Sequence, residues 1–565
     1  MKILGIHDGH NSGASILVNG EIICSISEER LSRKKNDLGY PKKSIDEVLK
    51  IADIDPQSLD SISFSTNFMH TEDHLQNISG WYSVGIEEQR RDSLKDKAYL
   101  NTLFESRRKD RIKDVVDHLG VSTNKIKFHE HHLCHAAAAY YGSHFTFDDK
   151  ILVLTADGAG DGLCSTVSIG HKGKLSRIAS TNRSASVGKI YSRVTYLLGL
   201  KPWEHEYKVM GLAPYGDKER SEKLITVFKD LVSLNKTNKL EFSIKSEVET
   251  NYCYKYLRDK LERARFDEIS RAIQTYTEDI MYEWVESCIK ETGITKIACG
   301  GGVFMNVKAN QKISEIKQLK DIFIFPSCGD ESLSLGACWQ EYYTKNNIKV
   351  ELDNIYLGGE FTNTQIEKAI QSFKFKSKVE VQKYEKIELE VAKKLAQNNI
   401  VARFSGKMEW GARALGNRSI ISNPSSWQNV EKINSMIKMR DFWMPFAPSI
   451  ISEKQDLYLK NKKNLNSSYM MMAFDTEAIA HDNIAAAVHP RDRSARAQIV
   501  TKKQNPKYHE LIKNFDDITG IPAVLNTSFN LHGFPLVYKP IDALNVFNKS
   551  GLNFLAIGNF LISKS

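Results

Sequence analysis

The sequence predicts an α/β protein with two domains, and three observations lead to this class. In the first region of the chain, a strand, an Asp-Gly loop and a hairpin follow one another twice. A later region alternates helical patterns with short apolar strands such as 400–404 and 521–525. At 565 residues, the chain is also longer than one hydrophobic core usually organises.

Composition places the chain among ordinary globular proteins. Apolar residues make up 41% and charged residues 26%, and the net charge of +9 suits an anionic substrate without demanding one. The N-terminus has only a short apolar run before Asp8, and no run reaches the roughly 18 residues that span a membrane. The eight cysteines lack paired spacing. We therefore expect a cytoplasmic enzyme with reduced thiols and no membrane partner.

The domain boundary is expected near residue 350. All cysteines lie between Cys24 and Cys338, and the polar stretch 343–353 follows the last of them. These features predict one domain over residues 1–345 and a second, smaller α/β domain over residues 355–565.

The first domain contains an internal repeat. An apolar strand at 3–6 ends at Asp8-Gly9, and the following strand turns back at a hairpin signal, Asn19-Gly20. The strand at 151–154 leads in the same way to Asp157-Gly158 and to a turn at residues 172–173. Singly, each Asp-Gly is compatible with an ordinary turn. Together they resemble the actin-like ATPase superfamily, in which two such hairpins hold phosphates and a metal across a cleft.

Four histidines lie within seven residues, in Phe128-His-Glu-His-His-Leu-Cys-His135. On a helix, His131 and His135 share one face and can bind a divalent metal together. The protease pattern that begins at His129-Glu130 fails, because Leu133 stands where its second histidine belongs. The alternative is a capped helix whose histidines are satisfied in a polar cleft.

Two further strand-to-helix junctions carry chemistry. The strand at 297–299 runs into Gly300-Gly-Gly302-Val-Phe-Met-Asn306, where glycines allow backbone to approach a ligand, although tight packing also explains many glycines. The strand at 321–325 leads to Asp330, just before a helical segment. A carboxylate at this position is expected to be a ligand or a helix N-cap.

The second domain contains a donor-rich segment. Residues 405–419 follow a strand directly and supply glycines, Arg413, Arg418 and Ser419, with few acceptors. Further donors come later in the sequence: Lys438, Arg440, Arg491, Arg493, Arg496, Asn526 and Ser528. Scattered surface cations would be the alternative, but the positions at strand ends favour an anion site.

Seven motifs then occur in one order, and together they resemble the NodU/CmcH family of O-carbamoyltransferases over nearly the whole chain. The motifs are Asp8-Gly-His, His-His-Leu-Cys-His135-Ala, Asp157-Gly-Ala-Gly-Asp, Lys208-Val-Met-Gly-Leu-Ala-Pro-Tyr-Gly216, Gly-Gly-Val-Phe-Met-Asn306, Gly-Ala-Arg-Ala-Leu-Gly-Asn-Arg418 and Leu-Asn-Thr-Ser-Phe-Asn530. The resemblance implies an N-terminal actin-like domain with a duplicated ribonuclease-H-like fold and a C-terminal YrdC-like domain.

The resemblance also implies a two-step reaction. The C-terminal domain would form carbamoyl-adenylate from carbamoyl phosphate and ATP, with Mg(II) accompanying the nucleotide. The N-terminal domain would then transfer the carbamoyl group to a hydroxyl of a small-molecule or glycan acceptor and release AMP, with the help of iron(II) or another divalent metal.

Site residues follow from the motif positions. The metal ligands and transfer residues implied in the first domain are His131, His135, Asp157 and Asp330. The implied nucleotide-binding residues there are Asp8, Gly9, Gly158, Lys208, Gly301, Gly302 and Asn306. In the second domain, the implied catalytic residues are Arg413, Arg418, Lys438 and Arg496, and the implied binding residues are Arg440, Asn526 and Ser528. His129 and His132 fall outside the matched spacing.

Three departures and two rival functions remain. No glycine precedes Arg496 in its run, and Met444 and Phe534 stand where relatives carry charged residues.

The rivals are a tRNA threonylcarbamoyl-type modifying enzyme and a non-catalytic actin-like ATPase module, but two catalytic domains in one chain argue against a nucleic-acid partner. A homodimer is left open. Residues 67–111, rich in histidine and aromatic residues, are either an acceptor surface or peripheral helices.

Overall fold

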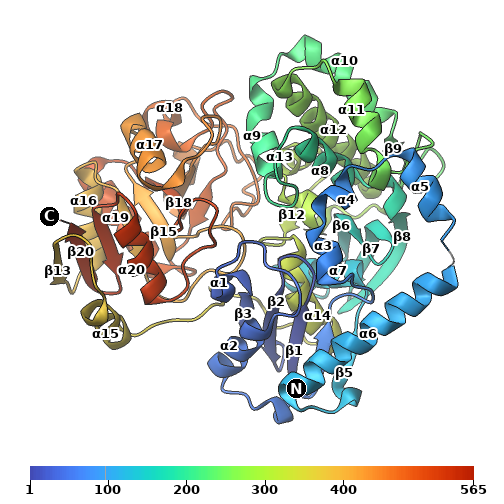
Figure 1. The fold of residues 1–565 in the computed structure, drawn as a ribbon. Coiled ribbons are helices and arrows are strands. Elements are labelled where there is room, and N and C mark those ends of the chain that lie inside the picture. Colours follow the sequence, from blue (N-terminus) through green and yellow to red (C-terminus); the bar gives the residue numbers. More distant parts are fainter. Residues whose placement is uncertain (96, 565) are drawn as a thin grey trace. The chain divides into compact units, whose positions relative to one another are not determined.

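The computed structural model describes residues 1–95 and 97–564 of the chain (Figure 1). The described residues form two compact units. Unit 1 comprises residues 1–28 and 36–352, and unit 2 comprises residues 29–35 and 353–565. The short segment 29–35 is therefore separated in sequence from the rest of its unit.

Unit 1 begins with a five-stranded sheet in the order β3-β2-β1-β4-β5. Strands β1 to β3 are antiparallel neighbours, whereas β4 and β5 run parallel to β1. Asn19 and Gly20 both have positive φ in the tight turn between β2 and β3, as the hairpin signal predicts. The strands are β1 Lys2–His7, β2 Gly13–Val18, β3 Glu21–Ser27, β4 Ser61–Phe64 and β5 Ile126–Phe128.

A second five-stranded sheet has the order β12-β11-β6-β7-β8. Read from its other end, this is the order of the first sheet, with an antiparallel hairpin followed by two parallel strands. The predicted duplicated, ribonuclease-H-like architecture is thus confirmed. The strands are β6 Ile151–Gly160, β7 Leu163–His171, β8 Lys174–Asn182, β11 Lys296–Gly300 and β12 Asp321–Ile324.

Two helices of the unit pack closely against each other, α7 (His131–Tyr141) and α14 (Leu333–Tyr343). Their contact is tight because Gly336 faces the backbone of Cys134, and a Cβ on Gly336 would lie 2.0 Å from the Cys134 carbonyl oxygen. The other helices are α2 Lys42–Ala52, α3 Glu72–Gln76, α4 Ile78–Tyr82, α5 Ile86–Ser93, α6 Lys97–Leu119, α8 Val187–Leu197, α9 Glu206–Leu212, α10 Lys218–Lys229, α11 Tyr254–Leu261, α12 Phe266–Thr292 and α13 Val307–Ser314. A separate two-stranded sheet joins β9 Val232–Leu234 and β10 Phe242–Ile244.

Unit 2 contains an eight-stranded mixed sheet in the order β13-β20-β19-β14-β15-β18-β16-β17. Its strands are β13 Val379–Lys383, β14 Val401–Phe404, β15 Arg418–Ser422, β16 Ala447–Ile451, β17 Gln498–Val500, β18 Ala523–Ser528, β19 Phe554–Ile557 and β20 Phe560–Lys564. Its helices are α1 Glu29–Ser32, α15 Asn363–Ser372, α16 Ile387–Ala396, α17 Trp427–Ile433, α18 Ala480–Asn483, α19 Pro506–Thr519 and α20 Pro540–Lys549.

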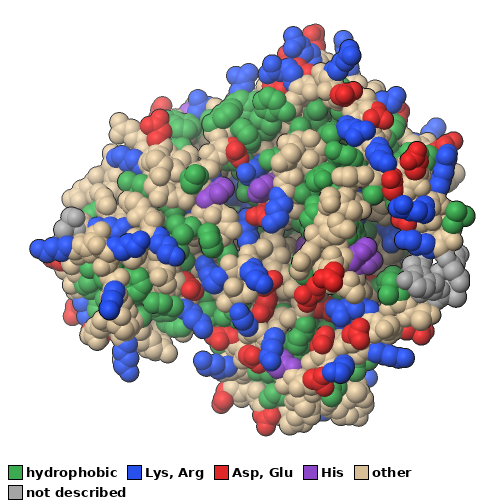
Figure 2. Space-filling view, in the orientation of Figure 1, with side chains coloured by type: hydrophobic (Ala, Val, Ile, Leu, Met, Phe, Trp, Pro, Cys, Tyr) green, Lys and Arg blue, Asp and Glu red, His purple; other side chains and the backbone are tan. Residues whose placement is uncertain are grey.

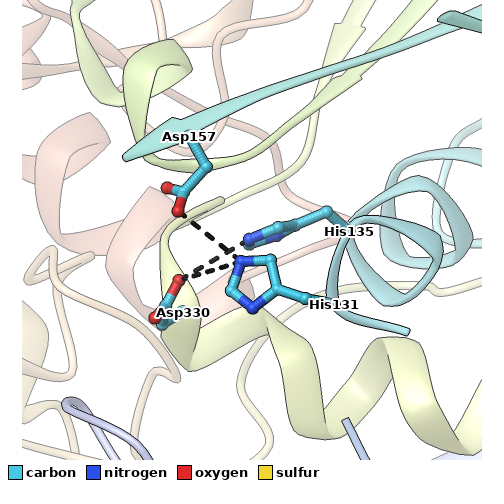
Figure 3. A group of neighbouring side chains, drawn as sticks. All are labelled: His131, His135, Asp157 and Asp330. Carbon is cyan, nitrogen blue, oxygen red and sulfur yellow. Dashed lines mark ion pairs between the residues drawn. The ribbon is translucent and has the colours of Figure 1, made fainter. Parts of the chain in front are cut away.

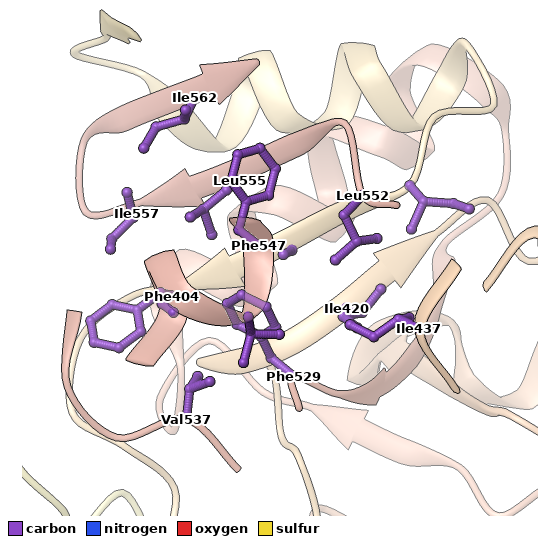
Figure 4. Close-up of a cluster of buried hydrophobic side chains, with 14 of the residues drawn as sticks. Phe404, Ile420, Ile437, Phe529, Val537, Phe547, Leu552, Leu555, Ile557 and Ile562 are labelled. Carbon is purple, nitrogen blue, oxygen red and sulfur yellow. The ribbon is translucent and has the colours of Figure 1, made fainter. Parts of the chain in front are cut away.

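Helices cover both faces of this sheet. Neighbouring strand residues alternate between two apolar clusters: Ile420 belongs to the one packed against α15 and α20 (Figure 4), and Ile421 to the one packed against α16 and α19. Burial on both faces accounts for the short, almost continuously apolar strands of this region. The predicted α/β class is confirmed, whereas the likeness to YrdC stays a prediction.

The cysteines, the helices and the surface charges can be compared with the expectations from composition. All eight cysteines are buried free thiols. In the part of the chain that the structure describes, no helix combines the length and apolar character needed to cross a membrane. Figure 2 shows Lys and Arg side chains interspersed with Asp and Glu over the visible face, so the net positive charge does not gather there into one patch.

Candidate metal centre and anion-binding loop

Four side chains that are far apart in sequence meet in unit 1 (Figure 3). Nε2 of His131 lies 3.5 Å from Oδ2 of Asp157 and 3.8 Å from Oδ1 of Asp330, and Nε2 of His135 lies 3.6 Å from the same Asp330 oxygen. One ligand atom from each residue lies within 4.8 Å of the other three. The structure therefore brings together the four residues that the resemblance implies as metal ligands.

The two histidines are presented by the first turns of α7. Glu130 is the N-cap of this helix, and its carboxylate accepts hydrogen bonds from the backbone N–H groups of His132 and Leu133. The helix begins at His131, so His131 and His135 project from one face. Room for the His131 ring comes from Gly160, because a Cβ there would lie 2.0 Å from the ring.

The two aspartates are held by backbone. Oδ1 of Asp157, in β6, accepts a 2.8 Å hydrogen bond from the N–H of Gly302. Asp330 opens the 3₁₀ turn Asp330–Ser332 directly before α14. The hydroxyl of Ser332 lies 3.3 Å from Nδ1 of His135, which leaves the Nε2 of that ring to face Asp330.

The donor set fits a divalent metal. Nε2 of His131 and Nε2 of His135 are buried and make no hydrogen bond, although each faces carboxylate oxygens. Burial opposes charge on His131, but Asp157 and Asp330 outweigh it and raise the pKa of His131 to about 9. Two imidazole nitrogens with two carboxylates are suitable ligands for iron, zinc or manganese. Metal binding by these residues remains a prediction.

Two further histidines contact the same group. Nε2 of His7 lies 3.8 Å and Nδ1 of His10 lies 3.4 Å from Oδ2 of Asp330. Burial lowers the pKa of His7 to about 4, so this ring is neutral around pH 7. His132, outside the matched spacing, instead lies 2.8 Å from the Thr155 hydroxyl through its Nδ1.

Asp8 has a different environment from that expected of a nucleotide ligand. Its carboxylate pairs with buried Arg111 of α6, at 2.7 and 2.8 Å from Nε and Nη2. Arg111 also donates to the carbonyl of Thr66. A carboxylate paired in this way holds the loop after β1 in place. The position of Gly9 and His10, which follow Asp8 in the chain, is therefore held by this ion pair. Sequence reasoning did not identify Arg111, because nothing local marks it as buried.

The glycine-rich junction after β11 lies beside the four candidate metal ligands. A Cβ on Gly301, where φ is +94°, would lie 2.3 Å from the Ala156 carbonyl oxygen, and one on Gly302 would lie 2.8 Å from Oδ1 of Asp157. The side chain of Asn306 caps α13 and exchanges hydrogen bonds with Gln274. Lys208 lies on α9, and Gly158 packs near Lys189.

In unit 2, the donor-rich loop is folded around a carboxylate. Glu409 is fully buried, and its Oε1 accepts hydrogen bonds from the backbone N–H groups of Leu415, Asn417 and Arg418 at 2.7 to 3.2 Å. Its Oε2 is buried without a hydrogen-bond partner. From the sequence alone, this segment is expected to be poor in acceptors, and Glu409 is not identified. The only sign of its role in the sequence is that it is an acidic residue among hydrogen-bond donors.

The two arginines of the loop differ in their surroundings. The guanidinium of Arg418 is buried, donates from Nη1 to the carbonyl of Ser405 and from Nη2 to that of Gly406, and stacks 3.6 Å from the centroid of the Phe404 ring. Burial lowers the pKa of Arg418 to about 10. Arg413 is partly exposed. The hydrogen bonds of Arg418 therefore hold the loop in its conformation. Within its guanidinium, Nε is buried and has no hydrogen-bond partner.

Lys438 and Ser528 meet beside the end of β18. The Lys438 ammonium is buried and donates to the Ser528 hydroxyl at 3.0 Å and to Oδ1 of Asn530. Burial, followed by the charge of Arg440, lowers the pKa of Lys438 well below its usual range. Arg440 donates to the Thr527 hydroxyl at 2.8 Å. These contacts converge on one strand end, as an anion site requires.

Asn526 is buried and takes part in hydrogen bonds within the unit. Its amide nitrogen donates to the carbonyl of Ala414 and to the Ser449 hydroxyl, so it ties the donor-rich loop to β16. Arg496 is partly exposed and lies just before β17, which is two strands away from β18 across β16.

Two family descriptions match this chain. "Carbamoyltransferase N-terminus" matches residues 2–339, and "Carbamoyltransferase C-terminus" matches residues 392–564. The chain belongs to the carbamoyltransferase family. This carbamoyltransferase is therefore an enzyme, and both the candidate metal ligands and the donor-rich loop lie within the matched ranges.

Relatives match all or part of the carbamoyltransferase chain. An uncharacterized protein of Methanocaldococcus jannaschii is 34% identical over 100% of this chain and 99% of its own length. Nodulation protein NolNO of Sinorhizobium fredii is 27% identical over 98% of this chain and 79% of its own. The 3'-hydroxymethylcephem-O-carbamoyltransferase of Streptomyces clavuligerus is 24% identical over 47% of this chain and 48% of its own.

Solved structures are more distant. Component A of the (R)-2-hydroxyglutaryl-CoA dehydratase from Acidaminococcus fermentans is 16% identical, covers 61% of this chain and 98% of that chain, and gives a TM-score of 0.33. A likeness at this level carries no argument about the chemistry of the carbamoyltransferase.

Proposed function

We propose that this carbamoyltransferase is an ATP-dependent O-carbamoyltransferase with two separate active sites. The single observation that carries the proposal is the convergence of His131, His135, Asp157 and Asp330 in unit 1, within a chain whose second unit carries a buried cationic loop. The acceptor would be a hydroxyl of a small molecule or a glycan.

The first step belongs to unit 2. Carbamoyl phosphate, ATP and water give carbamoyl-adenylate, phosphate and pyrophosphate. Lys438, Arg440 and Ser528 support this assignment, because their side-chain donors gather at the end of β18, beside the start of β15 where Glu409 holds the loop in shape. A planar guanidinium and an ammonium suit phosphate oxygens, and a rigid loop positions them before the substrates arrive. Mg(II) would accompany ATP.

The second step belongs to unit 1. The acceptor oxygen forms a bond to the carbamoyl carbon, and the bond from that carbon to the phosphate oxygen of the adenylate breaks. AMP leaves with the electron pair, and the hydroxyl proton is released to water. His131, His135, Asp157 and Asp330 would hold iron(II) or another divalent metal. A metal bound there would supply Lewis-acid polarisation of the carbamoyl carbonyl. The Gly302 N–H fixes Asp157, and Ser332 fixes the ring of His135.

The test incubates the full chain with carbon-labelled carbamoyl phosphate, ATP, Mg(II) and iron(II). We expect carbamoyl-adenylate to accumulate when no acceptor is present, together with equal amounts of pyrophosphate. The same incubation with a Lys438→Met variant should produce no adenylate. A folded, metal-loaded protein that hydrolyses ATP without forming the adenylate would contradict the proposal and favour a plain ATPase.

A further inference from the structure

A buried lysine next to the metal cluster has no role in the function described so far. The side chain of Lys189, in the first turn of α8, is 8% exposed. Its backbone N–H donates to the cap residue Ser186, but among the described residues its ammonium has neither a hydrogen-bond acceptor nor a carboxylate in contact. A lysine side chain that is mostly buried and has no acceptor among the described residues can bind an anionic ligand.

The start of α8 rests directly on the loop that carries Asp157. The hydroxyl of Ser186 donates to the backbone carbonyl of Asp157 at 3.1 Å. A Cβ on Gly188 would lie 3.1 Å from that carbonyl oxygen and 3.1 Å from the nitrogen of Gly158, which shows how closely the helix start approaches this loop. The N–H groups and positive dipole end of an eleven-residue helix therefore lie beside the metal cluster.

The side chain of Lys189 extends along the same loop. A Cβ on Gly158 would lie 3.7 Å from Cε of Lys189, which places the end of this side chain over the Asp157–Gly158 segment. On its other side, the ammonium lies 5.7 Å from the centre of the Trp81 ring. Burial, followed by the charge of Arg193, lowers the pKa of Lys189 to about 7, and Asp157 and Asp330 act in the opposite direction, so Lys189 belongs to the same local field as the proposed metal ligands.

We propose that Lys189 and the N-terminus of α8 form a phosphate-binding site that holds the phosphate of carbamoyl-adenylate, and then of AMP, next to the metal cluster. The assignment rests on the proposed function for the identity of the nucleotide. An ammonium and free helix N–H groups form the standard combination for a phosphate at a helix start. When the bond between the carbamoyl carbon and the phosphate oxygen breaks, negative charge grows on that phosphate, and Lys189 stabilises it there.

The test compares the binding of AMP and adenosine by calorimetry in full-length protein. All proteins carry Lys438→Met, which removes the nucleotide site proposed for unit 2. We expect AMP to bind more tightly than adenosine, Lys189→Met to weaken AMP binding at least tenfold without changing adenosine binding, and Lys189→Arg to restore most of the difference. Lys174→Met, on the exposed hairpin strand β8, removes the same charge and should leave both affinities unchanged.

The outcomes separate this site from the proposed function. If Lys189→Met weakens AMP and adenosine equally, or neither, the phosphate site is wrong. In protein with Lys438 intact, Lys189→Met should still form carbamoyl-adenylate at the wild-type rate but transfer it slowly. Absence of adenylate in the wild type, with Lys189-dependent AMP binding retained, would overturn the proposed function and leave the phosphate site standing.

Discussion

At the scale of single residues, His135 offers the clearest separation of the two proposed steps. Its imidazole is fully buried in unit 1, and its Nδ1 contacts the Ser332 hydroxyl. We predict that His135→Ala binds less than about a tenth of the wild-type iron and loses transfer, because removal of one ligand typically lowers metal affinity sharply. Carbamoyl-adenylate synthesis should continue. Metal analysis and a labelled-carbamoyl assay measure the two effects.

A matched control is His144→Ala, which removes an exposed histidine paired with Asp321 at 2.9 Å. This variant should keep both the iron and the transfer activity. Equal loss of adenylate synthesis and transfer in His135→Ala would contradict the assignment of the steps to different units.

Glu409 allows a second prediction at this scale. Glu409→Gln keeps the size of the side chain, but an amide places one uncharged oxygen among the three N–H groups that the carboxylate now binds. Hydrogen bonds to a charged acceptor contribute about 1.5–3 kcal/mol each. We therefore expect adenylate synthesis to fall at least tenfold, with unit 2 destabilised by about 1–3 kcal/mol in urea unfolding.

The control for Glu409 is Glu380→Gln, on an exposed position of β13. It should change neither the rate nor the unfolding midpoint. Wild-type adenylate synthesis in Glu409→Gln would show that the loop keeps its conformation without this carboxylate.

The set of four candidate metal ligands was implied by the family resemblance, and the residues alone gave less. The helical spacing of His131 and His135 indicates a shared helix face, whereas nothing in the sequence brings Asp157, in β6, and Asp330 to them, because that meeting depends on the fold. Glu409, Arg111 and Lys189 could not be found in this way. Each is a charged residue whose own position carries no local signal, and its importance comes from burial, which only the fold reveals.

At the scale of elements, the contact between α7 and α14 brings together two segments that carry candidate metal ligands. α7 carries both histidines, and Asp330 lies just before α14. We predict that Gly336→Ala destabilises the unit by about 1–3 kcal/mol, because its Cβ must displace the Cys134 carbonyl, 2.0 Å away. Iron affinity should fall as well, since the helices that carry the ligands must move apart.

Urea unfolding and iron titration measure these two effects. Thr344→Ala, at the exposed end of α14, serves as the control and should remain within about 0.5 kcal/mol of wild type. Unchanged iron affinity in a destabilised Gly336→Ala protein would mean that the ligand cluster does not depend on this helix contact.

The strand arrangement was predictable from the sequence in unit 1 but not in unit 2. The repeated strand and Asp-Gly pattern led to the duplicated sheets, because hairpins have local signals such as Asn19-Gly20. The order of strands in unit 2 had no such signal. Its eight strands pair mostly with partners remote in sequence, such as β14 with β19, and remote pairing leaves no periodic trace in the chain.

At the scale of the whole molecule, the two units each contain their own sheets and apolar cores. Metal binding to the folded form stabilises only the unit that holds the ligands. In scanning calorimetry, we therefore predict that iron(II) raises the unfolding temperature of the transition assigned to unit 1. At a thousandfold excess of iron(II) over Kd, the free energy of unfolding of this unit should increase by about 4 kcal/mol. The transition of unit 2 should not move.

Chelation provides the reverse experiment. Stripped protein should show the lower unit 1 transition and retain adenylate synthesis when Mg(II) is supplied. A shift of both transitions by iron(II), or of neither, would contradict a single metal centre in unit 1. The His135→Ala variant should show no iron-dependent shift.

The segment Glu29–Lys35 has a consequence for how the chain is made. It belongs to unit 2, where Arg30 donates to the carbonyl of Gly411 and Arg33 to those of Pro535 and Leu536. On the ribosome, these seven residues emerge long before the rest of their unit, so unit 2 cannot be completed until synthesis is nearly finished. A gene cut before Asp353 would separate unit 2 from two of its own arginines, and the fragment would need residues 29–35 supplied as a peptide.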